Sequence, residues 1–210
     1  MAIEKTQELI ETCLDAPGLR TDEKAFTRER SLGAKKILHL ILRRIYHSLQ
    51  LCLDKYFERF GILSTSKQAF SQSRKHLNPE YVRSFADMTS ELAAQDNTMP
   101  SYNGMRLIAI DGSDIALENT AELKEAFGCS GPKSDAATAL CSIAYDPLNH
   151  AIYDCHIDRY TTDEHTLAKE HIKRLSELGL LGSLLLFDRG YPSAEFIAFL
   201  YEFGFKFVML

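Results

Sequence analysis

Apolar residues in the first half of the chain recur at helical spacing. Across residues 34–60 they fall three or four positions apart, which predicts one long amphipathic helix that ends before Gly61. Serine and threonine at 64–66 provide an N-cap for a second helix over 67–76. A third helix is expected over 78–95, because that segment opens on Asn-Pro. The first half of the chain is therefore predicted to be helical.

After a turn-rich segment at 96–101, the pattern changes to short apolar runs separated by turns. We predict strands at 105–111, 138–145, 150–157, 183–188 and 205–210. Helices at about 162–178 and 194–203 connect the last three strands. The order β-β-β-α-β-α-β requires an antiparallel meander, followed by strands that pair in parallel through helical crossovers. This order resembles that of the ribonuclease H-like fold.

Two domains are predicted, giving a mixed α/β protein. Residues 1–100 would form a helical domain that binds DNA, and residues 101–210 a partial ribonuclease H-like catalytic domain. The first part has 15 Lys and Arg against 13 Asp and Glu, and the second has 9 against 16. Residues 28–75 hold 11 basic and three acidic residues, which favours contact with a polyanion. The alternative is that these charges only solvate the outer faces of helices.

The second and third predicted helices resemble a helix-turn-helix arrangement. At helical spacing Lys67 shares one face with Arg74 and Lys75, while Ala69 and Phe70 turn inward. Such a polar, basic face suits DNA, although any small helical bundle can show the same pattern.

Two of the predicted strands end on an aspartate. Strand 105–111 ends on Asp111, which Gly-Ser follows, and strand 183–188 ends on Asp188, which Arg-Gly-Tyr-Pro-Ser follows. On neighbouring strands the two carboxylates would hold Mg²⁺ or Mn²⁺ for phosphoryl transfer. The alternative is that each aspartate is only a turn residue.

Other polar residues have simpler interpretations. Asp163-Glu164 is expected to be a helix start, with Thr161 as the cap of a capping box. We expect His165 and His171 to be exposed, and His156 to lie on a solvated strand face rather than in a metal site.

Five scattered cysteines, none in a CxxC pair, argue against a disulfide framework or a zinc site, and buried reduced thiols are expected. No apolar run approaches the length of a membrane span, and no signal peptide opens the chain. We therefore expect a cytoplasmic protein without a membrane partner.

The sheet order and four sequence motifs together resemble the DDE transposases of the insertion-sequence-four type. The resemblance runs from about Phe26 to Leu210. Its motifs are the lead-in 26–32, the helix at 66–75, Asp-Gly-Ser at 111–113 and Asp-Arg-Gly-Tyr-Pro-Ser at 188–193.

This resemblance implies roles for individual residues. Asp111 and Asp188 would be the first two members of a metal-binding, catalytic acidic triad that uses Mg²⁺ or Mn²⁺. Arg189 and Tyr191 would contact the DNA phosphates, as would Arg28 and Arg30 of the lead-in together with Lys67, Arg74 and Lys75 of the basic helix. The partners would be double-stranded DNA at the transposon ends and target, bound by a homodimer in the bacterial cytoplasm.

The third member of the family's triad is a glutamate on a helix after the last strand. The sequence ends within that strand, at Leu210, and both Glu195 and Glu202 lie upstream of it. We therefore expect the C-terminally truncated, N-terminal portion of a transposase, which lacks the third acidic residue and is inactive alone. The alternatives are a DNA-binding remnant or inhibitor without catalysis, and a ribonuclease H-like nuclease of another kind.

Overall fold

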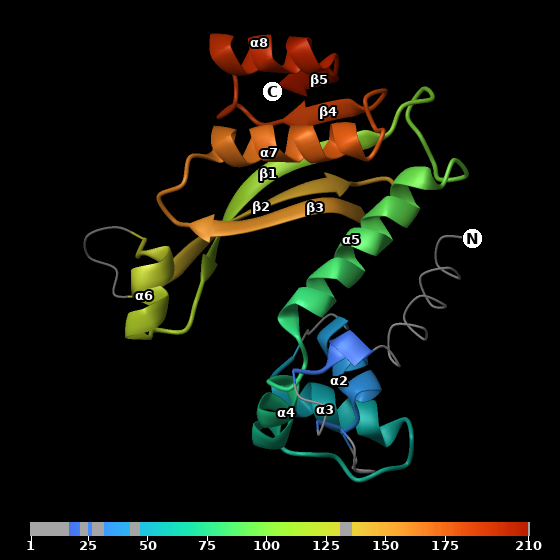
Figure 1. Cartoon of the computed structure of the whole chain (residues 1–210), viewed down its shortest axis with the longest axis vertical. Coiled ribbons are helices and arrows are strands. Elements are labelled where there is room, and N and C mark those ends of the chain that lie inside the picture. The colour runs from blue at the N-terminus through green and yellow to red at the C-terminus, as the bar shows by residue number, and fades with distance from the viewer. Residues whose placement is uncertain (1–16, 22–24, 27–31, 43–46, 131–135, 210) are drawn as a thin grey trace. The chain divides into compact units, whose positions relative to one another are not determined.

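The chain forms two compact units, made of residues 3–86 and 87–210. The computed structural model describes residues 17–21, 25–26, 32–42, 47–130 and 136–209 (Figure 1). The boundary between the units falls within a helix, and each unit has its own buried core. No helix within the described residues is long and apolar enough to cross a lipid bilayer.

The first unit is helical, as the apolar spacing predicts. Its elements are η1 (Pro17–Leu19), α2 (Ala34–Leu42), α3 (Leu49–Glu58), α4 (Lys67–Arg74) and the start of α5 (Pro79–Gln95). Their apolar faces meet in one core, whose largest fully buried side chains are Leu19, Ile37, Leu38, Leu53 and Phe57. Phe70 of α4 also points into this core, as expected, while Lys67 remains exposed.

The prediction of one long helix over 34–60 is wrong, because the structure has two helices in this range. Helix α2 ends at Leu42 and α3 begins at Leu49. The hydroxyl of Ser48 accepts a hydrogen bond from the Leu51 backbone N–H at 3.5 Å, which caps the start of α3. Apolar spacing continues across this cap, so periodicity alone could not reveal the break. The N-cap predicted at 64–66 is confirmed, since Ser66 accepts from the Ala69 N–H at 3.2 Å.

The second unit is a five-stranded mixed sheet with helices. Its elements are β1 (Leu107–Ala116), α6 (Ala121–Phe127), β2 (Thr138–Asp146), β3 (Ala151–Arg159), α7 (Glu164–Glu177), β4 (Leu184–Phe187), α8 (Ala194–Phe203) and β5 (Lys206–Met209). The strand order is β3-β2-β1-β4-β5. Strands β1, β2 and β3 pair antiparallel, whereas β4 pairs parallel with both β1 and β5. The predicted ribonuclease H-like order is confirmed, apart from α6, which the sequence analysis missed.

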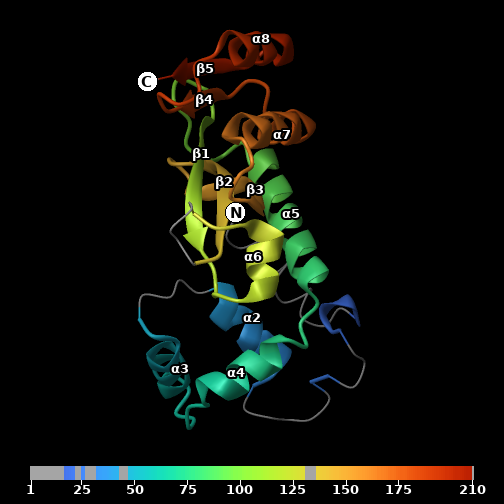
Figure 2. The same ribbon diagram turned by 90° about the vertical axis from the view of Figure 1, so that its left-hand side faces the viewer.

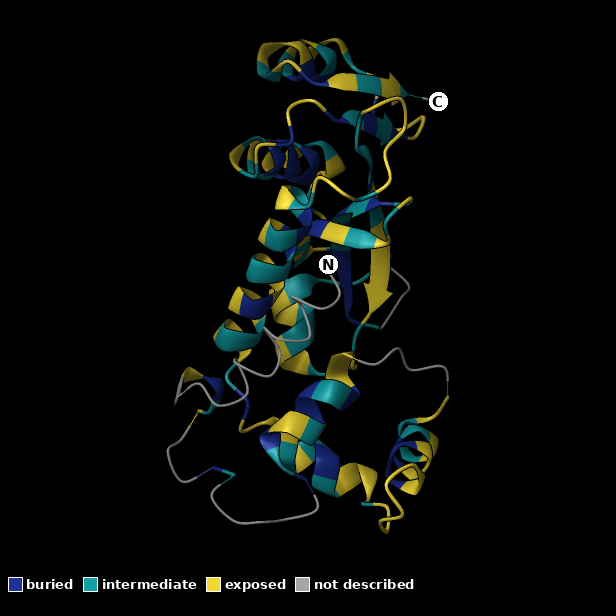
Figure 3. Cartoon of the chain, turned by 90° about the vertical axis from the view of Figure 1, so that its right-hand side faces the viewer, coloured by how far each residue is buried: buried dark blue, intermediate teal, exposed yellow. Residues whose placement is uncertain are grey.

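Helices α7 and α8 pack on the sheet in one core (Figure 2). Because both crossovers progress in the same direction across the sheet, both helices lie on the same face. Ile108, Ile110 and Leu185 of the strands are fully buried beneath Ile172 and Leu175 of α7. Figure 3 shows this as a buried stripe along α7. The core thus fixes the height and rotation of α7 above strands β1 and β2.

The turn-rich segment at 96–101 is tied to the second unit. The Arg106 guanidinium donates a hydrogen bond to the Asp96 carbonyl, and the Asn149 side-chain amide donates to the Pro100 carbonyl at 3.0 Å. These bonds hold the chain in place immediately before β1.

Candidate metal centre

Strands β1 and β4 bring Asp111 and Asp188 together. In their parallel ladder, Leu107 lies opposite Leu184 and Ala109 opposite Leu186. Asp111 follows Ala109 by two residues within β1, and Asp188 follows Leu186 by two residues, just past the end of β4. Extending the register by two residues places Asp111 and Asp188 opposite one another and on the same face. Both side chains are exposed. The fold therefore contains the neighbouring strands on which the predicted pairing of the two aspartates depends.

The prediction that Asp111 ends its strand is wrong. Strand β1 continues to Ala116, because β2 pairs with it along residues 109–116. It is the shorter strand β4 that ends here, at Phe187, immediately before Asp188. Asp111 thus lies on the part of β1 that extends past its parallel neighbour, where its carboxylate is open to solvent.

Backbone N–H groups orient both carboxylates. The Gly112 N–H donates to Asp111 Oδ1 at 2.9 Å, and the Gly190 N–H donates to Asp188 Oδ1 at 2.8 Å. A Cβ atom at Gly190 would lie 3.1 Å from that same oxygen. Glycine at 190 therefore lets the chain turn tightly around the Asp188 carboxylate.

A third carboxylate, that of Glu164, reaches the same place from the start of α7. A Cβ atom at Gly112 would lie 3.0 Å from Glu164 Oε1, so the glutamate lies directly against β1 beside Asp111. Burial raises the pKa of Glu164, and the negative charges of Asp111 and Asp188 raise it further. The second unit therefore gathers at least three acidic side chains here.

The capping box predicted for α7 is wrong. The N-cap is Asp163, whose carboxylate accepts from the Thr166 N–H at 3.1 Å, and not Thr161. Glu164 is consequently the first residue of the helix and not the third, and its side chain is free to turn toward β1. Sequence reasoning missed this contact; the available signal was Gly112, a residue without a side chain directly after Asp111.

Tyr191 is buried, which argues against the predicted contact with DNA. It is 1% exposed, and its ring packs among Phe187, Phe196 and His165, with centroids 5.2–5.8 Å apart. Its hydroxyl oxygen is buried without a hydrogen-bond partner among the described residues. Burial raises the pKa of Tyr191, as do the charges of Glu164, Asp111 and Asp188. The Tyr191 ring is therefore part of the core, packed against the residue that precedes Asp188 and the residue that follows Glu164.

The remaining predicted DNA contacts are exposed or lie outside the described residues. Arg189 is exposed directly after Asp188, and Lys67, Arg74 and Lys75 are exposed on and just after α4. Arg28 and Arg30 lie outside the described residues.

The carboxylates suit a hard divalent cation. Asp111, Asp188 and Glu164 offer only oxygen ligands, which Mg²⁺ and Mn²⁺ prefer. Among the described residues, no lysine or arginine forms an ion pair with any of the three. Their mutual repulsion is thus not neutralised within the second unit, and a divalent cation would relieve it.

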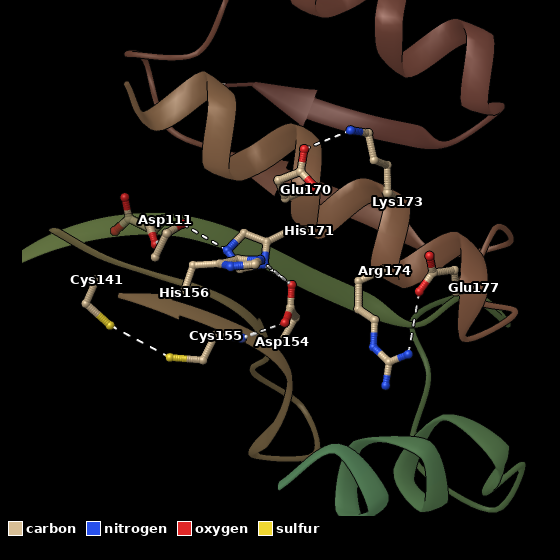
Figure 4. Close-up of polar contacts among 11 residues, drawn as sticks. Asp111, Cys141, Asp154, Cys155, His156, Glu170, His171, Lys173, Arg174 and Glu177 are labelled. Carbon is tan, nitrogen blue, oxygen red and sulfur yellow. Dashed lines mark hydrogen bonds and ion pairs between the residues drawn. The ribbon is translucent and has the colours of Figure 1, made fainter. Parts of the chain in front are cut away.

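A second polar cluster lies beneath α7, on the meander (Figure 4). Asp154 Oδ2 on β3 contacts His171 Nδ1 at 2.7 Å and His156 Nε2 at 2.9 Å. Burial by itself would raise the pKa of Asp154, but the hydrogen bonds from His156 and His171 hold it well below its usual value. His171, which we expected to be exposed, is fully buried.

This cluster is linked to the strand that carries Asp111. His171 Nε2 lies 3.0 Å from the Ser142 hydroxyl oxygen. The Ser142 hydroxyl in turn donates a hydrogen bond to the Asp111 carbonyl oxygen at 3.4 Å. Among the described residues, only Asp154, His156 and His171 bring three ligand atoms within 4.8 Å of one another. The carboxylate oxygens of Asp111, Asp188 and Glu164 therefore do not all lie within 4.8 Å of one another.

The described cysteines are not buried as predicted, and Cys13 lies outside the described residues. Cys52, Cys129 and Cys141 are partly exposed and Cys155 is exposed, all as free thiols. Cys141 Sγ and Cys155 Sγ lie 3.9 Å apart on adjacent strands, as Figure 4 shows.

Comparison with known proteins gives one family match. The family model described as "Transposase DDE domain" matches residues 102–209, which is just over half of the chain. A solved structure of a piggyBac transposase synaptic complex with hairpin DNA is similar at 14% identity and a TM-score of 0.40, a likeness too low to argue from. The match covers 98% of this chain and 40% of that one. No curated protein is similar enough to be matched.

Proposed function

The chain belongs to the transposase DDE domain family, and we propose that it serves DNA transposition by cutting and joining DNA strands in metal-dependent phosphoryl transfer. The observation that carries the proposal is the parallel register of β1 and β4, in which Ala109 and Leu186 lie opposite one another, each two residues before its aspartate. Both lie within the part of the chain that the family model matches.

Asp111 and Asp188 are the proposed metal ligands and catalytic residues. The Gly112 and Gly190 N–H groups hold one oxygen of each carboxylate, so both side chains are oriented before any ion binds. When bound, Mg²⁺ or Mn²⁺ would supply Lewis-acid polarisation of a phosphoryl oxygen and activate an attacking hydroxyl. The exposed Arg189, next to Asp188, would bind a phosphate of the DNA.

The first unit is proposed to bind double-stranded DNA. Lys67, Arg74 and Lys75 are exposed along α4 and its end, so a phosphate backbone could contact all three. The basic residues Arg28 and Arg30 are proposed as further contacts. The transposon ends and the target would be the substrates, with two copies of the chain on the DNA.

Within the family, we propose a transposase of the insertion-sequence-four type. The motifs that support this are Asp-Gly-Ser at 111–113 and Asp-Arg-Gly-Tyr-Pro-Ser at 188–193. Glu195 and Glu202 lie on α8, before β5, so neither matches the family's third glutamate, which follows the last strand. No residue of 1–210 is therefore proposed for that position.

A nicking assay tests the proposal. We expect the purified chain to nick supercoiled plasmid DNA with Mn²⁺, and Asp111→Asn and Asp188→Asn each to abolish nicking. Glu170→Gln is the matched control, because Glu170 is an exposed acid on α7 that pairs with Lys173. Nicking that survives in both aspartate variants would assign the activity to other residues or to a contaminating nuclease.

A further inference from the structure

We propose that Glu164 is a further carboxylate ligand of the divalent-ion centre, beside Asp111 and Asp188. This inference rests on the proposed function, since it takes Asp111 and Asp188 as the first two ligands. It concerns a residue on a different helix from the one that carries the third acid in the family.

The contact between Glu164 and Gly112 is the first argument. A side chain at 112 would press on the glutamate and push its carboxylate away, because a Cβ atom there would lie 3.0 Å from Oε1 and 3.1 Å from Cδ. The bare backbone at Gly112 thus admits the Glu164 carboxylate to the strand that carries Asp111. The fold also fixes its approach, since α7 is anchored two turns later by His171, whose Nε2 contacts Ser142 opposite Gly112.

The Tyr191 hydroxyl is the second and independent argument. A buried hydroxyl without a partner costs about 1–3 kcal/mol, so proteins rarely leave one unsatisfied. This one has no partner among the described residues, and its ring packs against His165, which follows Glu164, and Phe187, which precedes Asp188. It is therefore placed to donate to a carboxylate, or to a water held on an ion, once the three side chains close around that ion.

Mn²⁺ binding by the full chain, measured by titration calorimetry, tests the inference without any activity assay. We expect Glu164→Gln to weaken Mn²⁺ binding roughly 10- to 100-fold, the range for losing a group that supports a metal site. Glu170→Gln and Glu195→Gln are the controls, because these exposed acids pair with Lys173 and Lys169 instead. Both should bind Mn²⁺ as the unchanged chain does.

Gly112→Ala provides a second variant that leaves the Glu164 carboxylate intact but displaces it. Its φ is not in the left-handed region, so alanine strains the backbone little. We expect weaker Mn²⁺ binding, and no further loss when Gly112→Ala and Glu164→Gln are combined, because both act on one contact. Additive losses would contradict the assigned contact.

The aspartate variants separate failure of this inference from failure of the proposed function. If Asp111→Asn and Asp188→Asn abolish Mn²⁺ binding while Glu164→Gln and Gly112→Ala bind normally, Glu164 is not a ligand and the proposed function stands. If both aspartate variants bind Mn²⁺ normally, the metal centre itself is wrong and this inference falls with it.

Discussion

Replacing Asp154 with alanine should destabilise the second unit by about 2–3 kcal/mol. The change removes the acceptor of His171 Nδ1, which lies at 2.7 Å and belongs to a fully buried side chain. A hydrogen bond to a charged group contributes about 1.5–3 kcal/mol to stability. A buried donor that has lost its acceptor cannot bond to water instead, so the whole contribution is lost. His156 adds little, because its side chain is 30% exposed and water can replace the carboxylate.

The assay is thermal and urea unfolding, with hydrogen exchange at the amides of β2 and β3 to report on the second unit alone. The melting temperature of that unit should fall by roughly 5–12 °C. Asp158→Ala is the control, since this partly exposed aspartate on β3 accepts a hydrogen bond from the neighbouring Arg159 N–H and not from a histidine of the cluster. It should change stability by less than about 0.5 kcal/mol.

The effect should also depend on pH. The pKa of Asp154 is lower in the folded chain than in the unfolded one, so its contribution is complete above about pH 4 and is lost as the pH falls further. The difference between Asp154→Ala and the unchanged chain should therefore shrink in acid. Equal stabilities at neutral pH, or a difference that grows in acid, would refute the assigned hydrogen bonds.

Three further predictions concern the DNA surface, Tyr191 and activity. The double change Arg74→Ala and Lys75→Ala should reduce the slope of log K for DNA binding against log salt concentration by about 0.9 per lost phosphate contact. The reduction should be larger than that caused by Arg83→Ala on α5, and equal effects would remove α4 from the DNA surface. Tyr191→Phe should not destabilise the metal-free chain in a thermal melt, because its hydroxyl has no partner there, and a loss above about 1 kcal/mol would reveal one. Residues 1–210 with Mg²⁺ should give no measurable strand transfer, since no residue matches the family's third glutamate; robust Mg²⁺-dependent cleavage that Asp111→Asn leaves unchanged would show that the wrong residues are assigned.

The two aspartates could be predicted from sequence because their signal is local. An apolar strand that leads to Asp188 and a Gly-Pro turn can be read within ten residues, and the helical crossovers then dictate parallel pairing with the strand of Asp111. Even the register follows once both strands are aligned by their apolar runs. What the local pattern could not give was the length of β1, which its pairing with β2 sets.

The contacts of Glu164 and His171 could not be predicted because they join segments far apart in the chain. Glu164 fits the third position of a capping box that begins at Thr161, and only the observed cap at Asp163 frees it for Gly112. His171 lies on a helix with many polar residues, so its burial became evident only with its partners Asp154 and Ser142. In both cases tertiary packing overrides the local pattern.

The measurement that tests the central claim most directly is a crystal structure of the chain grown with Mn²⁺, with anomalous diffraction to locate the ion. Our account predicts an anomalous peak between Asp111 and Asp188, with carboxylate oxygens about 2.0–2.3 Å from it. A peak only among Asp154, His156 and His171, the cluster whose ligand atoms already lie within 4.8 Å, would contradict the account, because the ion would then occupy a site away from the two aspartates.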